Sequence, residues 1–208
     1  MPSWSMRAAA ADLARRDPAL SAVIAEVGPP RLGTPVQGPN RHFRYLVRAI
    51  TFQQLAGQAA RTIHGRVLEA VGDLPTPHDV LAADPAALRS AGLSAAKAAS
   101  ITDLATRCAD GRLDLERIAR RPDAAIMESV TEVRGIGPWT AEMFLLFQLR
   151  RPDVWPVGDL GVRKGWAAIQ GRDGDVSVDE LSEAGERYRP WRSVAAWYCW
   201  RALDVIVP

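Results

Sequence analysis

The segment from residue 133 to residue 141 reads Val-Arg-Gly-Ile-Gly-Pro-Trp-Thr-Ala and joins two glycines to a proline that can open a helix. Glycines at 135 and 137 allow a tight turn with uncovered backbone N–H groups, and such groups at a helix N-terminus hold a phosphate. A carboxylate, Asp159, follows 22 residues after Gly137. A Gly-x-Gly turn alone is a weak signal. The turn and the carboxylate together predict a phosphate-binding site with an acidic group beyond the next helix.

The distribution of charge favours a polyanion as the partner. The formal net charge is only +2, so the total by itself indicates nothing. Residues 41–66, however, contain five arginines, two histidines and no acid, and residues 134–172 contain five arginines and one lysine against three acids. Local basic faces of this kind suit a polyanion. From charge alone, a solvated helix face that lacks acids is an equal alternative.

The composition is that of an ordinary soluble globular chain. Of its 208 residues, 48% are hydrophobic and 24% are charged. No apolar run approaches the ~20 residues that a membrane-spanning helix needs, and the N-terminus lacks the apolar segment of a secretory signal. Cys108 and Cys199 lie far apart and show no metal-ligand spacing, which predicts reduced, buried thiols. We therefore expect a cytoplasmic protein without a membrane partner.

Helix signals dominate the chain, and alternating strand patterns are nearly absent. Asp-Pro pairs at 17–18 and 84–85 and a capping box at 177–180 predict helix starts, and Gly92 and Gly111 predict helix ends. Helices are expected near residues 5–15, 18–27, 41–57, 57–71, 77–83, 85–91, 95–110, 114–120, 122–131, 138–149, 159–169, 178–188 and 191–204.

The stretch 28–40 contains four prolines and three glycines and predicts an irregular connector. It separates an N-terminal piece, residues 1–40, from the main helical body, residues 41–208. The segment 122–149 within that body predicts helix, turn, helix, with one apolar face on each helix. Its turn would be exposed, with Gly135 and Gly137 free to adopt positive φ and the Thr140 hydroxyl directed outward.

The sequence of this hairpin, Gly-Ile-Gly-Pro-Trp-Thr-Ala, resembles that of the helix-hairpin-helix of base-excision DNA glycosylases. The resemblance is to the 3-methyladenine DNA glycosylase II branch in particular. Three other segments are similar to that alkylation-repair branch in the same order: residues 48–60, 83–98 and 188–200. The resemblance implies an all-α fold of two helical lobes with a DNA-binding cleft. Larger members begin with a β-rich domain, and residues 1–40 are too few to form it, so a core-only member is expected.

The resemblance implies that Asp159 is catalytic. Breaking an N-glycosidic bond builds positive charge on the sugar, and a fixed carboxylate stabilises that charge and orients the attacking water. A helix N-terminus favours the anion. Without the hairpin upstream, a helix N-cap would be the better interpretation of Asp159. Relatives with lyase activity carry a lysine where Trp139 stands, so no Schiff base is expected.

The family's base pocket matches Trp139 and Trp200, with Met143 in place of an aromatic. An alkylated purine such as 3-methyladenine is cationic, and an indole face attracts a cation by about 0.5–2 kcal/mol. The base must first be flipped out of the stack. Core packing of a tryptophan is the alternative interpretation.

A base-flipping enzyme also needs a residue that fills the gap in the base stack. The candidates Gln53, Gln54 and Leu55 lie in the turn between two helices of the acid-free segment, and the resemblance favours Gln54. A polar helix end is the alternative. Arg163 and Lys164 are candidates for holding the flanking DNA backbone, although a solvated face explains them equally well.

Related hairpins bind a monovalent cation through backbone carbonyls, which here would be those of Thr131, Val133 and Ile136. No other cofactor is expected, and an iron–sulfur cluster is excluded because Cys199 is the only cysteine near the C-terminal end. The implied partner is double-stranded DNA that contains alkylated bases, bound by a monomer.

The sequence therefore predicts a monofunctional DNA glycosylase that flips out and excises alkylated purines by hydrolysis in base excision repair. A non-catalytic helix-hairpin-helix DNA-binding protein is one alternative, against which Asp159 and the paired tryptophans argue. A glycosylase for other damaged or mismatched bases is the second. Trp139 argues against its lyase-coupled form only.

Overall fold

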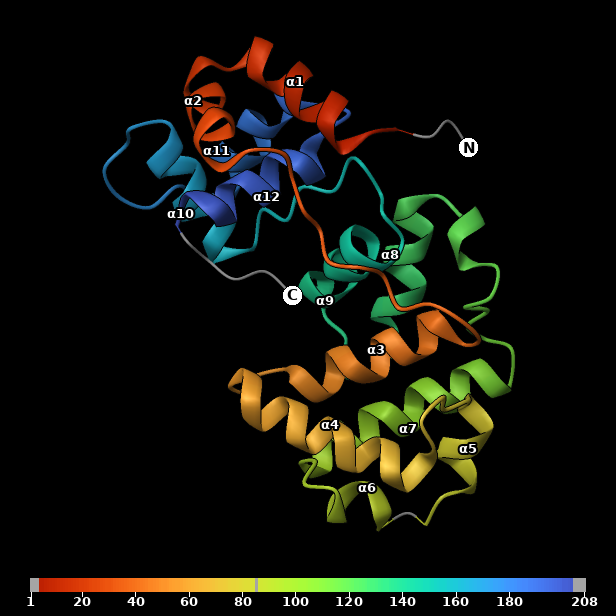
Figure 1. Cartoon of the computed structure of the whole chain (residues 1–208). Coiled ribbons are helices and arrows are strands. Elements are labelled where there is room, and N and C mark those ends of the chain that lie inside the picture. The colour runs from red at the N-terminus through yellow and green to blue at the C-terminus, as the bar shows by residue number, and fades with distance from the viewer. Residues whose placement is uncertain (1–3, 85, 204–208) are drawn as a thin grey trace. The chain divides into compact units, whose positions relative to one another are not determined.

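The computed structural model describes residues 4–84 and 86–203, and every regular element in these ranges is a helix (Figure 1). The prediction of an all-α fold is confirmed. In the same ranges, no helix has the length and apolar character that crossing a membrane requires. The chain forms two compact units: one contains residues 1–34 and 145–208, and the other contains residues 35–144. We call them unit 1 and unit 2.

Unit 1 is built from an N-terminal and a C-terminal segment of the chain. Its helices are α1 (Met6–Arg16), α2 (Pro18–Val27), α10 (Leu160–Ile169), α11 (Val178–Gly185) and α12 (Arg192–Ala202), with a short 3-10 turn η3 (Glu186–Tyr188). Asp17 caps α2, as its Asp-Pro pair predicts, and it also accepts hydrogen bonds from Tyr188 Oη at 2.7 Å and Gln170 Nε2 at 2.9 Å. A buried carboxylate thus fastens the N-terminal helices to the C-terminal ones.

Helices α10 and α12 pack with their backbones in direct contact. A Cβ atom on Gly165 would lie 1.9 Å from the carbonyl oxygen of Cys199, so only glycine fits there. This close approach fixes the start of α10 against α12, and the start of α10 carries Asp159. Figure 1 shows α10 and α12 beside each other in unit 1.

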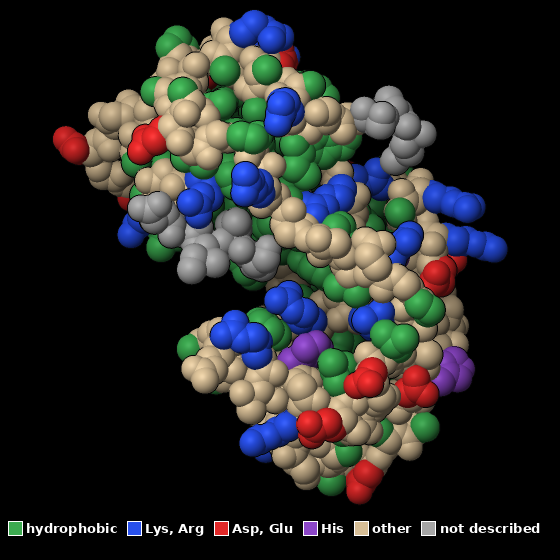
Figure 2. All heavy atoms as spheres, in the orientation of Figure 1, with side chains coloured by type: hydrophobic (Ala, Val, Ile, Leu, Met, Phe, Trp, Pro, Cys, Tyr) green, Lys and Arg blue, Asp and Glu red, His purple; other side chains and the backbone are tan. Residues whose placement is uncertain are grey.

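Unit 2 holds the acid-free segment and the hairpin. Its helices are α3 (Arg41–Phe52), α4 (Gly57–Val71), α5 (Pro77–Ala82), α6 (Ala87–Ser90), α7 (Ala95–Ala109), α8 (Asp123–Thr131) and α9 (Pro138–Met143), with a 3-10 turn η1 (Ile118–Arg120). On the face drawn in Figure 2, several basic side chains lie near α3, and acidic and basic side chains are mixed over the rest of this unit.

The predicted helices differ from the observed ones mainly at their ends. The expected helix 41–57 stops at Phe52, because Gln53 turns to an extended ψ of 131° and Gln54 takes a left-handed φ of 54°, and neither continues a helix. The expected helix 138–149 is α-helical only to Met143 and continues as a π-helix, η2 (Phe144–Gln148). Of the expected helix 114–120, only η1 forms.

Two predicted helix caps are also corrected. Helix α6 starts at Ala87 with Ala86 as its N-cap, and the Asp84 carboxylate accepts from Ala86 N at 2.8 Å instead of capping the helix directly; Pro85 lies outside the described residues. The predicted capping box of α11 is half formed: Ser177 accepts from the backbone of Glu180, whereas the Glu180 carboxylate pairs with Arg172.

Candidate active site

The hairpin consists of α8 and α9, joined by a turn whose two glycines differ in backbone conformation and in packing. Gly135 has a φ of +76°, and a Cβ atom there would lie 2.4 Å from Ser100 Oγ, so both its conformation and its packing require glycine. Gly137 is the N-cap of α9 with a φ of −91°. The prediction that both glycines can use positive φ therefore holds for Gly135 only. A Cβ atom on Gly137 would meet no described atom within 4 Å.

The start of α9 presents one large side chain to solvent and buries the next. Trp139 is 46% exposed, whereas Thr140 is only 6% exposed and its Oγ1 lies 3.4 Å from Gln53 Nε2. The prediction that the Thr140 hydroxyl points outward is wrong, because Gln53 covers it. Met143, the third residue of interest in this helix, is buried, and its carbonyl accepts a hydrogen bond from Tyr45 Oη at 3.1 Å.

The three candidates for the wedge, the residue predicted to fill the gap in the base stack, lie in the turn between α3 and α4, residues 53–56, which we call the wedge turn. Gln53 is half-buried, and its amide donates to the carbonyl of Gly135 at 3.0 Å as well as to Thr140. Gln54 and Leu55 are exposed at the tip of the turn. The side chain of Gln53 is thus held within the protein, and Gln54 and Leu55 are the members that reach solvent.

Asp159 in unit 1 is the N-cap of α10. Its Oδ1 accepts a hydrogen bond from Val162 N at 2.8 Å and another from Trp200 Nε1 at 2.9 Å. Gly161 makes the second bond feasible, because a Cβ atom there would lie 2.8 Å from Trp200 Cδ1. The carboxylate is therefore oriented by a backbone donor and an indole donor at the positive end of a helix dipole.

Trp200 reaches Asp159 from a buried position. The residue is 3% exposed, and its ring stacks on Phe147 with centroids 5.9 Å apart and planes inclined by 26°. Of the three predicted pocket residues, Trp139 and Met143 thus belong to α9 of unit 2 and Trp200 belongs to α12 of unit 1. Only Trp139 is largely exposed.

Two basic residues follow Asp159 on α10. The guanidinium of Arg163 forms an ion pair with Asp175 at 3.1 Å. The side chain of Lys164 is exposed and forms no hydrogen bond or ion pair with any described residue. Of the two predicted backbone contacts, Lys164 is therefore the one whose charge is not already committed to an acid.

The three carbonyls predicted to hold a cation lie at the end of α8 and in the turn. Ile136 N donates to the carbonyl of Val133 at 3.1 Å, which closes the turn and leaves that oxygen a second lone pair. Carbonyl oxygens are hard donors that suit a hard cation. No group of three or more His, Cys, Asp or Glu side chains in the described ranges has a metal-binding arrangement, so a cation at the hairpin would depend on the backbone.

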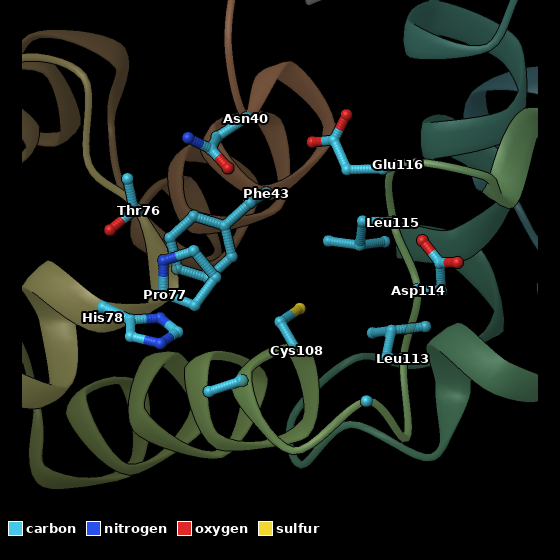
Figure 3. A pocket seen from close by; sticks show the side chains of 12 residues that line it. Asn40, Phe43, Thr76, Pro77, His78, Cys108, Leu113, Asp114, Leu115 and Glu116 are labelled. Carbon is cyan, nitrogen blue, oxygen red and sulfur yellow. The ribbon is translucent and has the colours of Figure 1, made fainter.

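A separate pocket of about 620 Å³ lies within unit 2. Figure 3 shows Phe43, Pro77 and His78 on one side of it and Leu113 and Leu115 on another, with Cys108 between them. None of the predicted site residues lines this pocket. Burial, followed by the nearby carboxylates of Asp110 and Asp114, raises the pKa of Cys108 to about 12. The thiol therefore stays protonated and is a poor nucleophile.

Comparison with known protein families shows which superfamily the chain belongs to. Residues 47–190 match the HhH-GPD superfamily of base excision DNA repair proteins. The chain belongs to this superfamily. The match includes the wedge turn, the hairpin and Asp159. It confirms the predicted resemblance and the helix-hairpin-helix.

Similar HhH-GPD proteins carry names from alkylation repair. DNA-3-methyladenine glycosylase 1 of Schizosaccharomyces pombe is 33% identical over 162 residues, which cover 76% of this chain and 71% of that protein. A crystal structure of a DNA-3-methyladenine glycosidase from Bacillus halodurans superposes with a TM-score of 0.81 at 34% identity, over 91% of this chain and 86% of that one.

A similar HhH-GPD protein has also been solved with DNA. The Schizosaccharomyces pombe 3-methyladenine DNA glycosylase in complex with abasic DNA has a TM-score of 0.80 at 30% identity, over 93% of this chain and 95% of that one. Together these likenesses place the chain in the alkylation-repair branch.

Sequence reasoning missed how the site residues of this HhH-GPD chain are held. The hydrogen bond of Trp200 to Asp159, and the bracing of the hairpin by Gln53, join residues that are 41 and 82 positions apart. Gly161 was the available signal for the first, since a glycine in a helix often marks a close approach. Nothing local to Gln53 distinguishes it from its neighbour Gln54.

Proposed function

We propose that this chain is a monofunctional DNA glycosylase that flips out alkylated purines of the 3-methyladenine type and excises them by hydrolysis in base excision repair. The observation that carries the proposal is the carboxylate of Asp159, held at the start of α10 by Val162 N and Trp200 Nε1. The names of two similar proteins support the choice of substrate.

Asp159 would act on the sugar. When the N-glycosidic bond breaks, its electron pair leaves with the base and positive charge develops at C1′ of the sugar. A carboxylate whose orientation is fixed in advance stabilises that charge without reorganising. The same group orients the water that adds to C1′ and takes its proton. An alkylated purine already carries a positive charge and leaves as a neutral base, so no strong general acid is needed.

Trp139 would supply the wall that attracts the base. Its indole is exposed on α9, and an electron-rich ring favours a cationic purine over a neutral one. Trp200, buried and bonded to Asp159 in unit 1, would add an aromatic face beside the carboxylate. The assignment of Met143 to the base pocket stays a prediction. Because Trp139 stands where lyase relatives carry a lysine, we propose hydrolysis without strand cleavage.

The hairpin and the wedge turn would position the DNA. Open space over Gly137 allows a phosphate to approach the first N–H groups of α9. A monovalent cation held by the carbonyls of Thr131, Val133 and Ile136 would add positive charge at this turn. Gln54 or Leu55 would fill the gap left by the flipped base. The predicted DNA-binding cleft, the monomeric state and the cytoplasmic location stay predictions.

A single assay tests the proposal against its alternatives. The protein is incubated with methylated duplexes, with 8-oxoguanine duplexes and with mismatched duplexes, and released base and strand breaks are measured before and after alkali. We expect base release from methylated DNA and strand breaks only after alkali. Binding without release from any duplex would indicate a non-catalytic DNA-binding protein. Strand breaks without alkali would contradict the monofunctional mechanism.

A further inference from the structure

We propose that one face of α7, formed by Lys97, Ser100 and Asp103, is a strut that sets the position of the wedge turn relative to the hairpin. The wedge turn is residues 53–56. The three strut residues are spaced three apart and therefore share one side of the helix. The inference rests on the proposed glycosylase function and assigns these residues a positioning role, without contact to DNA.

Lys97 on α7 holds the backbone of the wedge turn in place. Its ammonium donates hydrogen bonds to the carbonyl of Thr51 at 2.8 Å and to the carbonyl of Gln53. Both carbonyls lie at the C-terminal end of α3, where they have no partner within the helix and where a cation is favourable. The carbonyl of Gln53 belongs to the peptide that leads into Gln54, so Lys97 sets the direction in which Gln54 leaves the helix.

Gln54 itself needs such support. Its φ of 54° lies in the left-handed region, which costs a residue other than glycine about 1 kcal/mol or more. A conformation of this kind persists only where its surroundings fix it. Lys97 holds the backbone carbonyl of Gln53, and the side-chain amide of the same residue is tied to Gly135 and Thr140, so the residue that precedes Gln54 is fixed at two points.

The other two strut residues hold the hairpin. Ser100 lies so close to Gly135 that a Cβ atom would be 2.4 Å from its Oγ. The carboxylate of Asp103 accepts a hydrogen bond from Arg134 N at 2.8 Å. Burial opposes ionisation of Asp103, but the hydrogen bonds from Arg134 N and Arg107 outweigh it and lower its pKa. The turn is thus hydrogen-bonded to α7 at Arg134 and packed closely against it at Gly135.

These contacts connect wedge turn, hairpin and α7 in a closed loop of interactions inside unit 2. A wedge that enters the base stack must be rigid, because unstacking a base pair costs a few kcal/mol. Ordering the wedge before DNA binds avoids an entropic cost at the moment of insertion. With the strut intact, the wedge turn lies at a fixed distance from the hairpin that would bind the DNA backbone.

The strut predicts a defect that depends on whether the lesion is base-paired. Lys97→Met removes the ammonium and keeps most of the side chain. We compare single-turnover base release from a methylated purine that is paired in a duplex and from the same purine in an unpaired bubble, where no wedge is needed. The variant should lose at least about tenfold on the paired lesion, equivalent to 1.4 kcal/mol, and less than about threefold on the unpaired one.

Three further variants make the result specific. Lys97→Arg keeps a cation and should recover most of the rate on the paired lesion. Arg89→Met is the matched control, since Arg89 also donates to a backbone carbonyl in unit 2, that of Leu93, away from the wedge turn. It should leave both rates unchanged. Gln53→Ala replaces Lys97→Met if the latter fails to fold, and should show the same preference for the unpaired lesion.

Two results would overturn the inference in distinguishable ways. Equal losses on paired and unpaired lesions, in variants that melt like the wild type, would show that Lys97 supports the fold and not the wedge. No base release by the wild-type protein from either substrate would refute the proposed function, and the strut would fall with it.

Discussion

The reactivity of the Asp159 carboxylate should depend on the hydrogen bond that Trp200 Nε1 donates to it. Trp200→Phe keeps an aromatic ring against Phe147 and removes the N–H that Asp159 Oδ1 accepts at 2.9 Å. A hydrogen bond to a charged group contributes about 1.5–3 kcal/mol, so base release should slow by roughly 10- to 100-fold. Affinity for undamaged duplex should not change.

A matched variant controls for loss of an indole N–H in general. Trp166→Phe removes the hydrogen bond that Trp166 Nε1 donates to Tyr188 Oη at 3.0 Å in the same unit. It should reduce stability and leave the rate of a folded sample unaltered. If both tryptophan variants slow base release equally, Trp200 has no specific role at Asp159.

At the residue scale, local sequence predicts a group's type better than its partner. Asp159 as the cap of α10 and Gly135 at a positive φ both follow from short-range signals that the structure bears out. Thr140 does not: its neighbours predict an exposed hydroxyl, but Gln53 arrives from another helix and covers it. Such contacts depend on packing, which the spacing of apolar residues does not determine.

The hairpin element contains a glycine whose role can be separated from folding. Gly137 has an ordinary φ and open space at its Cβ position, so Gly137→Ala should change stability by no more than about 1 kcal/mol. DNA binding should weaken, because a methyl group would stand where a phosphate approaches. Thermal unfolding and duplex titration measure the two effects. Unchanged affinity would contradict backbone recognition at this turn.

Helix α3 introduces a pH dependence of stability. His42 is 5% exposed and its ring meets that of Phe144 edge-on, with centroids 5.7 Å apart. Burial, followed by the charge of Arg41, lowers the pKa of His42 from 6.5 to about 4. Between these pH values the unfolded chain binds a proton at His42 that the folded chain does not. The contribution of His42 to the free energy of unfolding is therefore fully present above pH 6.5 and is lost as the pH falls towards 4.

The size of this effect can be measured by urea unfolding. A shift of this extent corresponds to roughly 3 kcal/mol lost between pH 7 and pH 4. His42→Gln, which cannot titrate, should remove that part of the decline while other groups keep theirs. The same slope in both proteins would show that His42 is not the titrating group.

At the element scale, the existence of the helices is predictable and their ends are less so. The helix starts at Pro18 and Pro138, and the stops at Gly92 and Gly111, follow from residues with fixed conformational preferences. The end of α3 does not, since Gln54 has no intrinsic tendency to leave a helix. The π-helical segment after Met143 likewise has no signal in its apolar sequence.

The molecule as a whole should bind DNA through a limited number of phosphate contacts. Exposed Lys164 forms no ion pair with any acid in residues 4–84 and 86–203, whereas Arg163 is paired with Asp175. Lys164→Ala should weaken binding to all duplexes alike and reduce the slope of log affinity against log salt by about one. Arg163→Ala is the control and should change the slope less. An unchanged slope in the lysine variant would remove Lys164 from the interface.

The grouping of elements into units is the feature that sequence describes least well. A connector at 28–40 is visible from its prolines and glycines, and these residues form no α-helix. Nothing in residues 1–27 indicates that they belong with the C-terminal helices. That assignment rests on long-range contacts of Asp17, which reach Gln170 and Tyr188, and on the bond from Tyr198 Oη to the carbonyl of Gly28.

The proposed reaction depends above all on the carboxylate of Asp159, and Asp159→Asn separates its chemistry from folding and DNA binding. Asparagine still accepts from Val162 N as an N-cap, so the variant should melt like the wild type and bind methylated duplex within about threefold of its affinity. Single-turnover release of the methylated base should fall by at least about 100-fold. Full retention of base release in a folded, DNA-binding variant would contradict the account.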